Sequence, residues 1–323
     1  MKKLHLGNKN IELNRGKKMA LPQLQPSDIE SIIPNCRVNG DQLNGGQKIV
    51  FPCSVHGENC AVKFVLLNNL SDDLDGTVTS KIEALRARVE REITIMRKVD
   101  SPNIVKMGSV DLTTTTYNGQ NLLYYSEEWI DGQDLAHIIQ ESGKLPIIDA
   151  VRLCRDMVQG ISELWALSKV HRDIKPQNII RRASDGVNVL LDLGLAFDLD
   201  DKSLTQYGCV PGTKIYFSPE QLDIAHKRDI DFRSDLFSLG IVLYQALIGN
   251  HPFYTYGMPD QELFLRIMNQ PIIVPNTIDT TIPKAVSDIV CRLLNKQPNG
   301  RYRKCSILLN ELDQIISSLE VQL

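Results

Sequence analysis

The sequence predicts an α+β fold with two lobes, a small β-rich lobe with one long helix and a larger, mainly helical lobe. The first reason is length, because 323 residues are too many for one ordinary compact core. The second is order, because β-like runs and one helical pattern come first and helical periodicity dominates from about residue 135. We therefore expect an extension over residues 1–30, a first lobe over 31–130 and a second lobe over 131–323.

The first elements are a basic extension and a hairpin. Residues 1–25 carry six Lys or Arg and one Glu, which indicates a flexible, solvated tail rather than a docking segment. Residues 49–51 and 60–65 are short β-rich runs, and residues 56–59 between them have turn chemistry. This pattern predicts two antiparallel strands.

A long helix should follow a polar loop. Ser80 and Glu83 form a capping-box pattern, in which the hydroxyl and the carboxylate each accept from a free backbone N–H. The apolar residues that then recur at steps of three and four are Ile82, Leu85, Val89, Ile93, Met96 and Val99. We expect this helix to end near residue 101, with further strands at about 105–112 and 122–129.

Composition excludes several classes of protein. The 36 Lys and Arg against 39 Asp and Glu give a net charge of -3, which argues against a dedicated nucleic-acid binder. No apolar run approaches the ~18 residues of a membrane span, and no apolar segment follows the basic start, so neither a span nor a signal peptide is expected. Seven cysteines without a C-x-x-C pair indicate reduced thiols and a cytoplasmic location.

The most specific motif covers residues 171–178, which read H-R-D-I-K-P-Q-N. Fourteen residues after Asn178 comes Asp192-Leu193-Gly194, directly behind a β-rich run. Together these segments resemble the signature set of the eukaryotic-like (Hanks-type) Ser/Thr protein kinase family. The resemblance implies a bilobal protein-kinase-like fold and covers about residues 35–310.

The resemblance assigns the phosphotransfer residues. Asp173 would orient the attacking hydroxyl, and Lys175 would offset charge on the transferred phosphate. Asn178 and Asp192 would supply oxygen ligands to Mg²⁺, with Mn²⁺ as a substitute, and Asn178 would thereby also help to bind the nucleotide.

The resemblance also assigns Lys63, in an A-V-K run, to the α and β phosphates of ATP. In the family this lysine pairs with a glutamate of the following helix, and we expect Glu92 to be that partner. Glu83 and Glu90 are the other candidates for the pair.

The glycine-rich loop is the weakest match. Reading back from residues 50–51 puts Leu43, Gly45 and Lys48 at the three glycine positions. The resemblance implies that Gly45, Val50 and Ala61 line the nucleotide site. Lys48 either places a cation over the phosphates or points into solvent, and we favour solvent.

The connection between the lobes can be placed at residues 125–132. By resemblance the backbone of Glu128 and Ile130 would bond adenine, and Asp134 would lie by the ribose. Glu127 would stand at the back of the adenine pocket, where a buried carboxylate needs a partner.

The second lobe supplies a substrate segment and structural contacts. By resemblance, Thr213 would contact Asp173 and Lys175, and Glu220 would pair with Arg301. Asp235 would anchor the backbone of the 171–172 loop, and His171 would have a packing role.

Arg172 needs an anion, because an unpaired buried cation is costly. In the family this is often a phosphate on the activation segment, for which Thr205 is best placed, with Ser203 and Tyr207 as alternatives. Asp198, Asp200 or Asp201 could also meet the charge, and no anion at all is a further alternative.

These residues indicate an ATP- and Mg²⁺-dependent Ser/Thr protein kinase that acts on protein hydroxyls and also autophosphorylates. The alternative is a pseudokinase or scaffold, which the eroded glycine loop and Glu127 favour. A small-molecule kinase is a third reading, which the substrate segment disfavours. We expect protein substrates, no nucleic acid and a cytoplasmic location, with secretion into a host cytosol as an alternative; the oligomeric state stays open.

Overall fold

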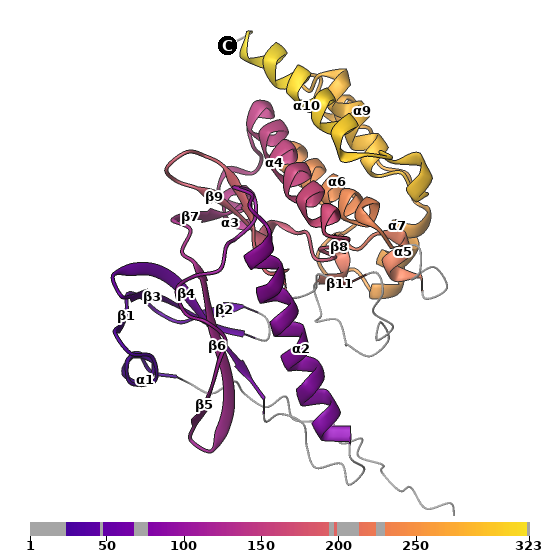
Figure 1. Cartoon of the computed structure of the whole chain (residues 1–323). Coiled ribbons are helices and arrows are strands. Elements are labelled where there is room, and N and C mark those ends of the chain that lie inside the picture. The colour runs from indigo at the N-terminus through magenta and orange to yellow at the C-terminus, as the bar shows by residue number, and fades with distance from the viewer. Residues whose placement is uncertain are drawn as a thin grey trace, which may run out of the picture.

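The computed structural model describes residues 24–45, 48–67, 77–193, 197–198, 213–223 and 230–321. Within these residues the chain forms a lobe built on a curled β-sheet and a second lobe built on helices (Figure 1). The α+β class and the order of the two lobes are as the sequence predicted.

The first lobe is built on an antiparallel six-stranded sheet. Its strands are β1 (Cys36–Val38), β2 (Leu43–Gly45), β3 (Lys48–Val55), β4 (Glu58–Leu66), β5 (Thr113–Tyr117) and β6 (Gln120–Glu128). They lie in the order β1-β3-β4-β6-β5, with β2 paired to β3. The β3–β4 pair is the hairpin predicted from residues 49–65.

One face of this sheet is covered by α1 (Pro26–Ile32). Along β3 the buried residues alternate with half-buried ones, so every second side chain enters the same apolar cluster. Leu24 and Ile29 are buried in that cluster with Ile49 and Phe51. The expected extension over residues 1–30 is therefore too long at its C-terminal end, because residues from 24 onward pack against the sheet.

The opposite face of the sheet meets α2 (Thr77–Lys98). Val89, Ile93 and Met96 of the predicted stripe are buried in the main core, together with Val65 of β4. The helix begins at Thr77, so the expectation that Ser80 caps its start is wrong. Figure 1 shows α2 running beside the sheet toward the second lobe.

The second lobe is mainly helical. Its helices are α3 (Leu135–Ser142), α4 (Ile147–Ala166), α5 (Pro219–Leu222), α6 (Phe232–Ile248), α7 (Asp260–Asn269), α8 (Pro275–Ile278), α9 (Lys284–Leu293) and α10 (Cys305–Glu320). The 3-10 turns are Pro176–Asn178, Thr213–Tyr216 and Pro298–Gly300. Helix α6 is buried on almost every side, as its nearly continuous apolar sequence predicts.

Short strands frame the junction of the lobes. They are β7 (Gly132–Asp134), β8 (Lys169–Val170), β9 (Ile179–Arg182), β10 (Asn188–Leu190) and β11 (Phe197–Asp198), paired as β10-β9-β7 and β11-β8. The H-R-D segment follows β8, and Asp192 lies two residues after β10. These strands thus fix the two ends of the predicted catalytic segment.

Two further features concern the described residues as a set. None of their helices combines the length and apolar character that crossing a bilayer requires. The described cysteines are free thiols, and Cys53 and Cys60 remain so although they face each other across β3 and β4.

Candidate active site

The loop of residues 171–178 holds Asp173 with one carboxylate oxygen hydrogen-bonded and the other without a partner among the described residues. Its Oδ2 accepts from Lys175 Nζ at 2.7 Å and from Asn178 Nδ2 at 3.0 Å. Its Oδ1 is buried and has no hydrogen-bond partner among the described residues. Burial raises the pKa of Asp173, and the Lys175 ammonium opposes that rise. The free oxygen can accept a proton that no described residue supplies.

Helix α6 anchors this loop through Asp235. The Asp235 carboxylate accepts from the backbone N–H of His171 and of Arg172, both at 2.8 Å. Arg172 has φ 67, a left-handed conformation that costs energy for a residue with a side chain. The two bonds from Asp235 hold the backbone in this conformation.

His171 is completely buried, and its ring makes structural hydrogen bonds. Its Nδ1 accepts from the N–H of Asp173 at 3.2 Å, so the ring proton is on Nε2, which donates to Leu191 O at 3.1 Å. The ring thereby connects the loop of residues 171–178 to the segment that carries Asp192.

Asp192 has φ 58, a second left-handed backbone in the site. Its Oδ1 accepts from Lys48 Nζ at 3.0 Å, and its side chain keeps 42% of its surface exposed. Burial disfavours the charged form, but Lys48 and then Lys63 outweigh this effect and hold the pKa of Asp192 well below its usual range. Asp192 is therefore an ionised, accessible carboxylate at neutral pH.

Asn178 and Asp192 form a donor set that fits Mg²⁺. Asn178 uses Nδ2 for two bonds to Asp173, to its carbonyl and its carboxylate, which leaves the amide oxygen available as a ligand. Among the described residues there is no group of three His, Cys, Asp or Glu that could hold a metal by itself. One carboxylate and one amide oxygen suit Mg²⁺, which usually takes its other ligands from water and phosphates.

The expected Lys63–Glu92 pair is wrong. Glu92 instead accepts from Lys48 Nζ, at 2.7 Å to Oε1 and 2.8 Å to Oε2. Lys63 Nζ lies 2.5 Å from Glu127 Oε1. The expectation that Lys48 points into solvent is also wrong, because its side chain is only 14% exposed.

The strand register explains these partners. Residues opposite each other in an antiparallel pair share a face, as do residues two apart along a strand. Val50 pairs with Lys63, and Lys63 pairs with Tyr125, so these three form one row. Lys48 lies in the row on one side of them and Glu127 in the row on the other, and Lys63 turns toward Glu127.

Glu127 thereby has the partner that its burial requires. Burial raises its pKa, and the adjacent Lys63 ammonium opposes this rise. Tyr125, completely buried in β6, accepts from Lys48 at 3.0 Å. The charged groups on this face therefore form two clusters, one around Lys48 and one around Lys63.

The residues expected near adenine lie where β6 leads into the second lobe. The Glu128 N–H donates to Lys106 O at 3.0 Å, and its carboxylate accepts from the Lys106 N–H at 2.8 Å. Ile130 is buried, and Asp134 caps α3 by accepting from the His137 N–H at 2.9 Å. Gly45 pairs with Lys48 across β2 and β3, and Val50 and Ala61 are half-buried beside Lys63.

The segment expected to bind the substrate is described only in part. Thr213 begins a 3-10 turn, its side chain is outside the description, and Thr205 and Gly46 lie outside the described residues. Glu220 and Arg301 form a two-pronged ion pair, with Nη1–Oε1 at 2.6 Å and Nη2–Oε2 at 3.0 Å.

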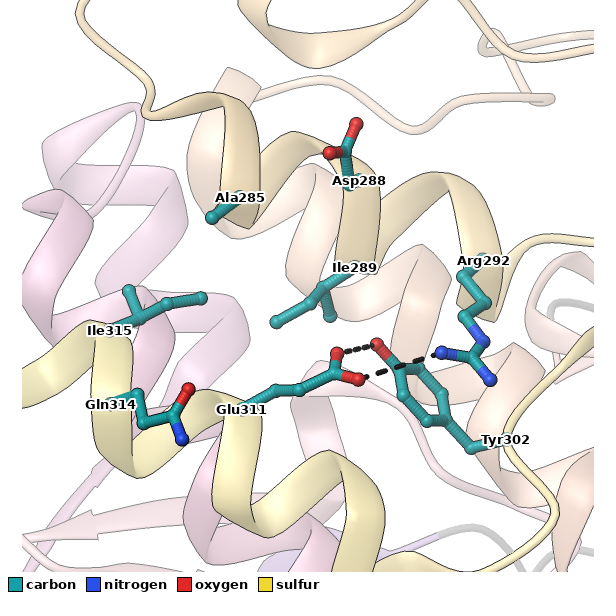
Figure 2. A pocket seen from close by; sticks show the side chains of 8 residues that line it. All are labelled: Ala285, Asp288, Ile289, Arg292, Tyr302, Glu311, Gln314 and Ile315. Carbon is teal, nitrogen blue, oxygen red and sulfur yellow. Dashed lines mark hydrogen bonds and ion pairs between the residues drawn. The ribbon is translucent and has the colours of Figure 1, made fainter.

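A separate hollow of about 300 Å³ lies between α9 and α10, at the end of the second lobe far from the sheet. Figure 2 shows Glu311 directed toward Tyr302 and Arg292. The Tyr302 hydroxyl donates to Glu311 Oε2, and Arg292 Nη1 lies 3.5 Å from Glu311 Oε1. These polar groups bind one another and belong to the packing of the two helices. The other lining residues are Ala285, Asp288, Ile289, Gln314 and Ile315.

Comparison with known proteins agrees with this geometry. A family model described as "Protein kinase domain" matches residues 45–312. A "Probable serine/threonine-protein kinase" of Clostridium perfringens is 29% identical over 271 residues, 84% of this chain and 37% of that protein. The serine/threonine-protein kinase PknE of Mycobacterium tuberculosis is 32% identical over 249 residues, 76% of this chain and 40% of that protein. The chain thus spans about two fifths of the length of these relatives.

Proposed function

Because the chain belongs to the protein kinase domain family, we propose that it transfers the γ-phosphate of ATP to serine or threonine hydroxyls of protein substrates. The observation that carries the proposal is the division of labour within the Asp173 carboxylate. Oδ2 is fixed by Lys175 and Asn178, while Oδ1 is buried with no partner among the described residues. A substrate hydroxyl would donate to that oxygen and so be aligned for in-line attack.

Lys175 has a second role in this proposal. Its Nζ lies 2.7 Å from Asp173 Oδ2. The ammonium would therefore lie beside the phosphate being transferred and offset its negative charge. As the hydroxyl attacks the phosphorus, its proton passes to Asp173 Oδ1 and the bond between the β and γ phosphates breaks. Asn178 and Asp192 would hold Mg²⁺, with Mn²⁺ as a substitute, and the bound metal would offset the charge of the phosphates.

The adenine end of the nucleotide is proposed to bind where β6 leaves the sheet. The backbone of Glu128 and Ile130 would bond the base, and Asp134 would lie near the ribose. Gly45, Val50 and Ala61 would line the same space. Thr213 is proposed to contact the catalytic loop, and Thr205 is proposed as an autophosphorylation site that would bring a phosphate to Arg172.

The scaffold alternative has lost one of its two supports. It rested on the eroded glycine loop and on a buried Glu127 without an evident partner, and Lys63 is that partner. A cytoplasmic location is proposed on the free thiols of Cys53 and Cys60, which face each other across two strands.

The test is incubation with γ-labelled ATP, Mg²⁺ and a generic protein substrate, beside Asp173→Asn. We expect label on Ser or Thr in the substrate, with at least a 100-fold lower rate in the variant and an unchanged circular dichroism spectrum. Mass spectrometry of the enzyme itself would show whether Thr205 is modified. Absence of transfer by the wild-type protein, or equal transfer by Asp173→Asn, would contradict the proposed function.

A further inference from the structure

Two lysines share one face of the first-lobe sheet, and among the described contacts only Lys48 reaches Asp192 and α2. Lys48 Nζ contacts Glu92 on α2, Tyr125 on β6 and Asp192 after β10. Lys63 Nζ contacts Glu127. Resting on the proposed function, we propose that Lys48, and not Lys63, is the lysine that binds the ATP phosphates.

The first argument is position relative to the metal ligand. An ammonium that binds phosphates next to the metal has to lie beside the metal-binding carboxylate. Lys48 is 3.0 Å from Asp192 Oδ1, the carboxylate assigned to Mg²⁺ above. Asp192 is 42% exposed on its side chain, so the space beside this pair is open to a ligand.

The second argument is support from the helix. A phosphate-binding lysine has to be held in place, because its flexible stem otherwise loses entropy on binding. Both carboxylate oxygens of Glu92 hold Lys48, at 2.7 and 2.8 Å, and Glu92 is completely buried. Helix α2 therefore positions Lys48, which is the task that the sequence had assigned to the pair of Glu92 with Lys63.

The third argument is the cost of releasing Lys63. Its partner Glu127 is buried, with 3% of its side chain exposed, and Lys63 Nζ lies 2.5 Å from Glu127 Oε1. If Lys63 turned to a phosphate, it would leave a buried carboxylate without a partner, which is strongly unfavourable. Lys48 can instead keep Glu92 as its partner, while its ammonium interacts with both Asp192 and a phosphate.

Charge on the face is consistent with this assignment. Lys63 and Glu127 neutralise each other, while Lys48 is shared between two carboxylates, Glu92 and Asp192. That cluster keeps one excess negative charge, which suits the addition of a cation with the nucleotide.

Labelling of the wild-type protein gives a test that needs no variant. An acyl phosphate derivative of ATP transfers its acyl group to a lysine amine next to the phosphates, with release of ATP. We expect peptide mapping to find the acyl group on Lys48 at least 10-fold more often than on Lys63, and free ATP to suppress it. Preferential labelling of Lys63 would overturn the proposal.

Variants give an independent comparison. Lys48→Met should lower kcat at least 100-fold and weaken the thermal shift produced by MgATP. The double variant Lys63→Met/Glu127→Met replaces the buried ion pair by apolar groups. Because this pair lies at the back of the proposed adenine site, we expect KM for ATP to change, while kcat falls at least 10-fold less than in Lys48→Met. Lys284→Met removes an exposed lysine of α9 and serves as the control for loss of one positive charge.

The outcomes separate this inference from the proposed function. An active wild-type protein whose activity survives Lys48→Met but not the double variant would refute the assignment of Lys48 and leave the kinase function standing. A wild-type protein that binds ATP without transfer would refute the function, while the labelled lysine would still decide the inference. A wild-type protein that neither binds ATP nor transfers phosphate would overturn both. Thermal unfolding of each variant without nucleotide identifies any loss that comes from misfolding.

Discussion

Glu220 and Arg301 are 81 residues apart in the sequence and form a buried ion pair in the second lobe. Arg301 also donates to the backbone carbonyls of Arg233 and of the adjacent Asn295 and Lys296, so its guanidinium joins these two segments to Glu220. The pair joins α5, which carries Glu220, to the segment that precedes α10. Burial raises the pKa of Glu220, but the interactions with Arg301 and Ser234 together outweigh this effect and lower the pKa, so the carboxylate stays charged.

The first prediction concerns this pair. Arg301→Leu leaves Glu220 buried without its cation, and we expect a loss of about 3–5 kcal/mol in the free energy of unfolding. Adding Glu220→Leu should restore part of the loss, because no buried charge then remains. Urea unfolding measures both, with Lys284→Ala as a surface control. Equal stability of Arg301→Leu and wild type would show that the pair has no structural role.

The second prediction concerns Asp235. Asp235→Asn keeps one acceptor oxygen where two backbone donors converge, so the 171–172 loop loses one of its bonds. We expect a loss of about 1.5–3 kcal/mol in the free energy of unfolding, the range for a hydrogen bond to a charged group, and at least a 10-fold fall in kcat. Asp231→Asn, at the start of the same helix, retains a good N-cap and loses only the ion pair with the Arg233 side chain, so it should cost about 1 kcal/mol or less and leave kcat unchanged. Normal kcat in Asp235→Asn would mean that the loop holds its geometry without this anchor.

The third prediction concerns His251 and pH. Its Nδ1 accepts from the N–H groups of Phe253 and Tyr254, and Nε2 donates to Ile215 O, which holds the neutral ring. Burial lowers the pKa of His251 to about 4. The unfolded chain binds this proton near pH 6.5, so stability should rise with pH between about 4 and 6.5.

The sign of this effect can be checked in two ways. NMR titration of the His251 ring should give a midpoint near pH 4, in the folded protein. The free energy of unfolding, measured by urea at pH 5 and pH 7, should be lower at pH 5, and His251→Gln should reduce the difference. A His251 midpoint near 6.5 would exclude this contribution.

The fourth prediction concerns metal dependence. Asp192→Asn removes the charged oxygen assigned to Mg²⁺, and we expect at least a 100-fold lower rate at any Mg²⁺ concentration. Asp185→Asn, in the exposed turn after β9, is the matched control and should keep wild-type activity. The thermal shift by ATP should depend on Mg²⁺ in the wild type and lose that dependence in Asp192→Asn. A Mg²⁺ dependence that survives the substitution would place the metal elsewhere.

The sequence predicted best what depends on short spacing. The loop of residues 171–178 needs its residues close together in the chain, so its motif already contains most of the local geometry around Asp173. The Glu220–Arg301 pair was reachable only through the family resemblance, since nothing local joins two residues so far apart.

The partners of the lysines could not be predicted in this way. Lys48, Lys63 and Glu127 lie on three strands. Their pairing depends on the register between these strands, which cannot be derived from a single sequence. A signal was nevertheless present, because Lys48 is two residues before Val50 and so had to share its face. Helix α1 was missed as well, although Ile29, Ile32 and Ile33 have helical spacing behind a favourable N-terminal Pro26.

The ion pair between Lys63 and Glu127 also has a pharmacological consequence. In the proposed nucleotide site it forms the rear wall behind adenine, where an apolar inhibitor group would have to displace a paired charge or stop short of it. Compounds that gain affinity by placing an apolar group in a rear cavity should therefore bind this protein weakly. Ligands that present a donor to Glu127, or an acceptor to Lys63, would find here a polar contact on which selectivity can be built.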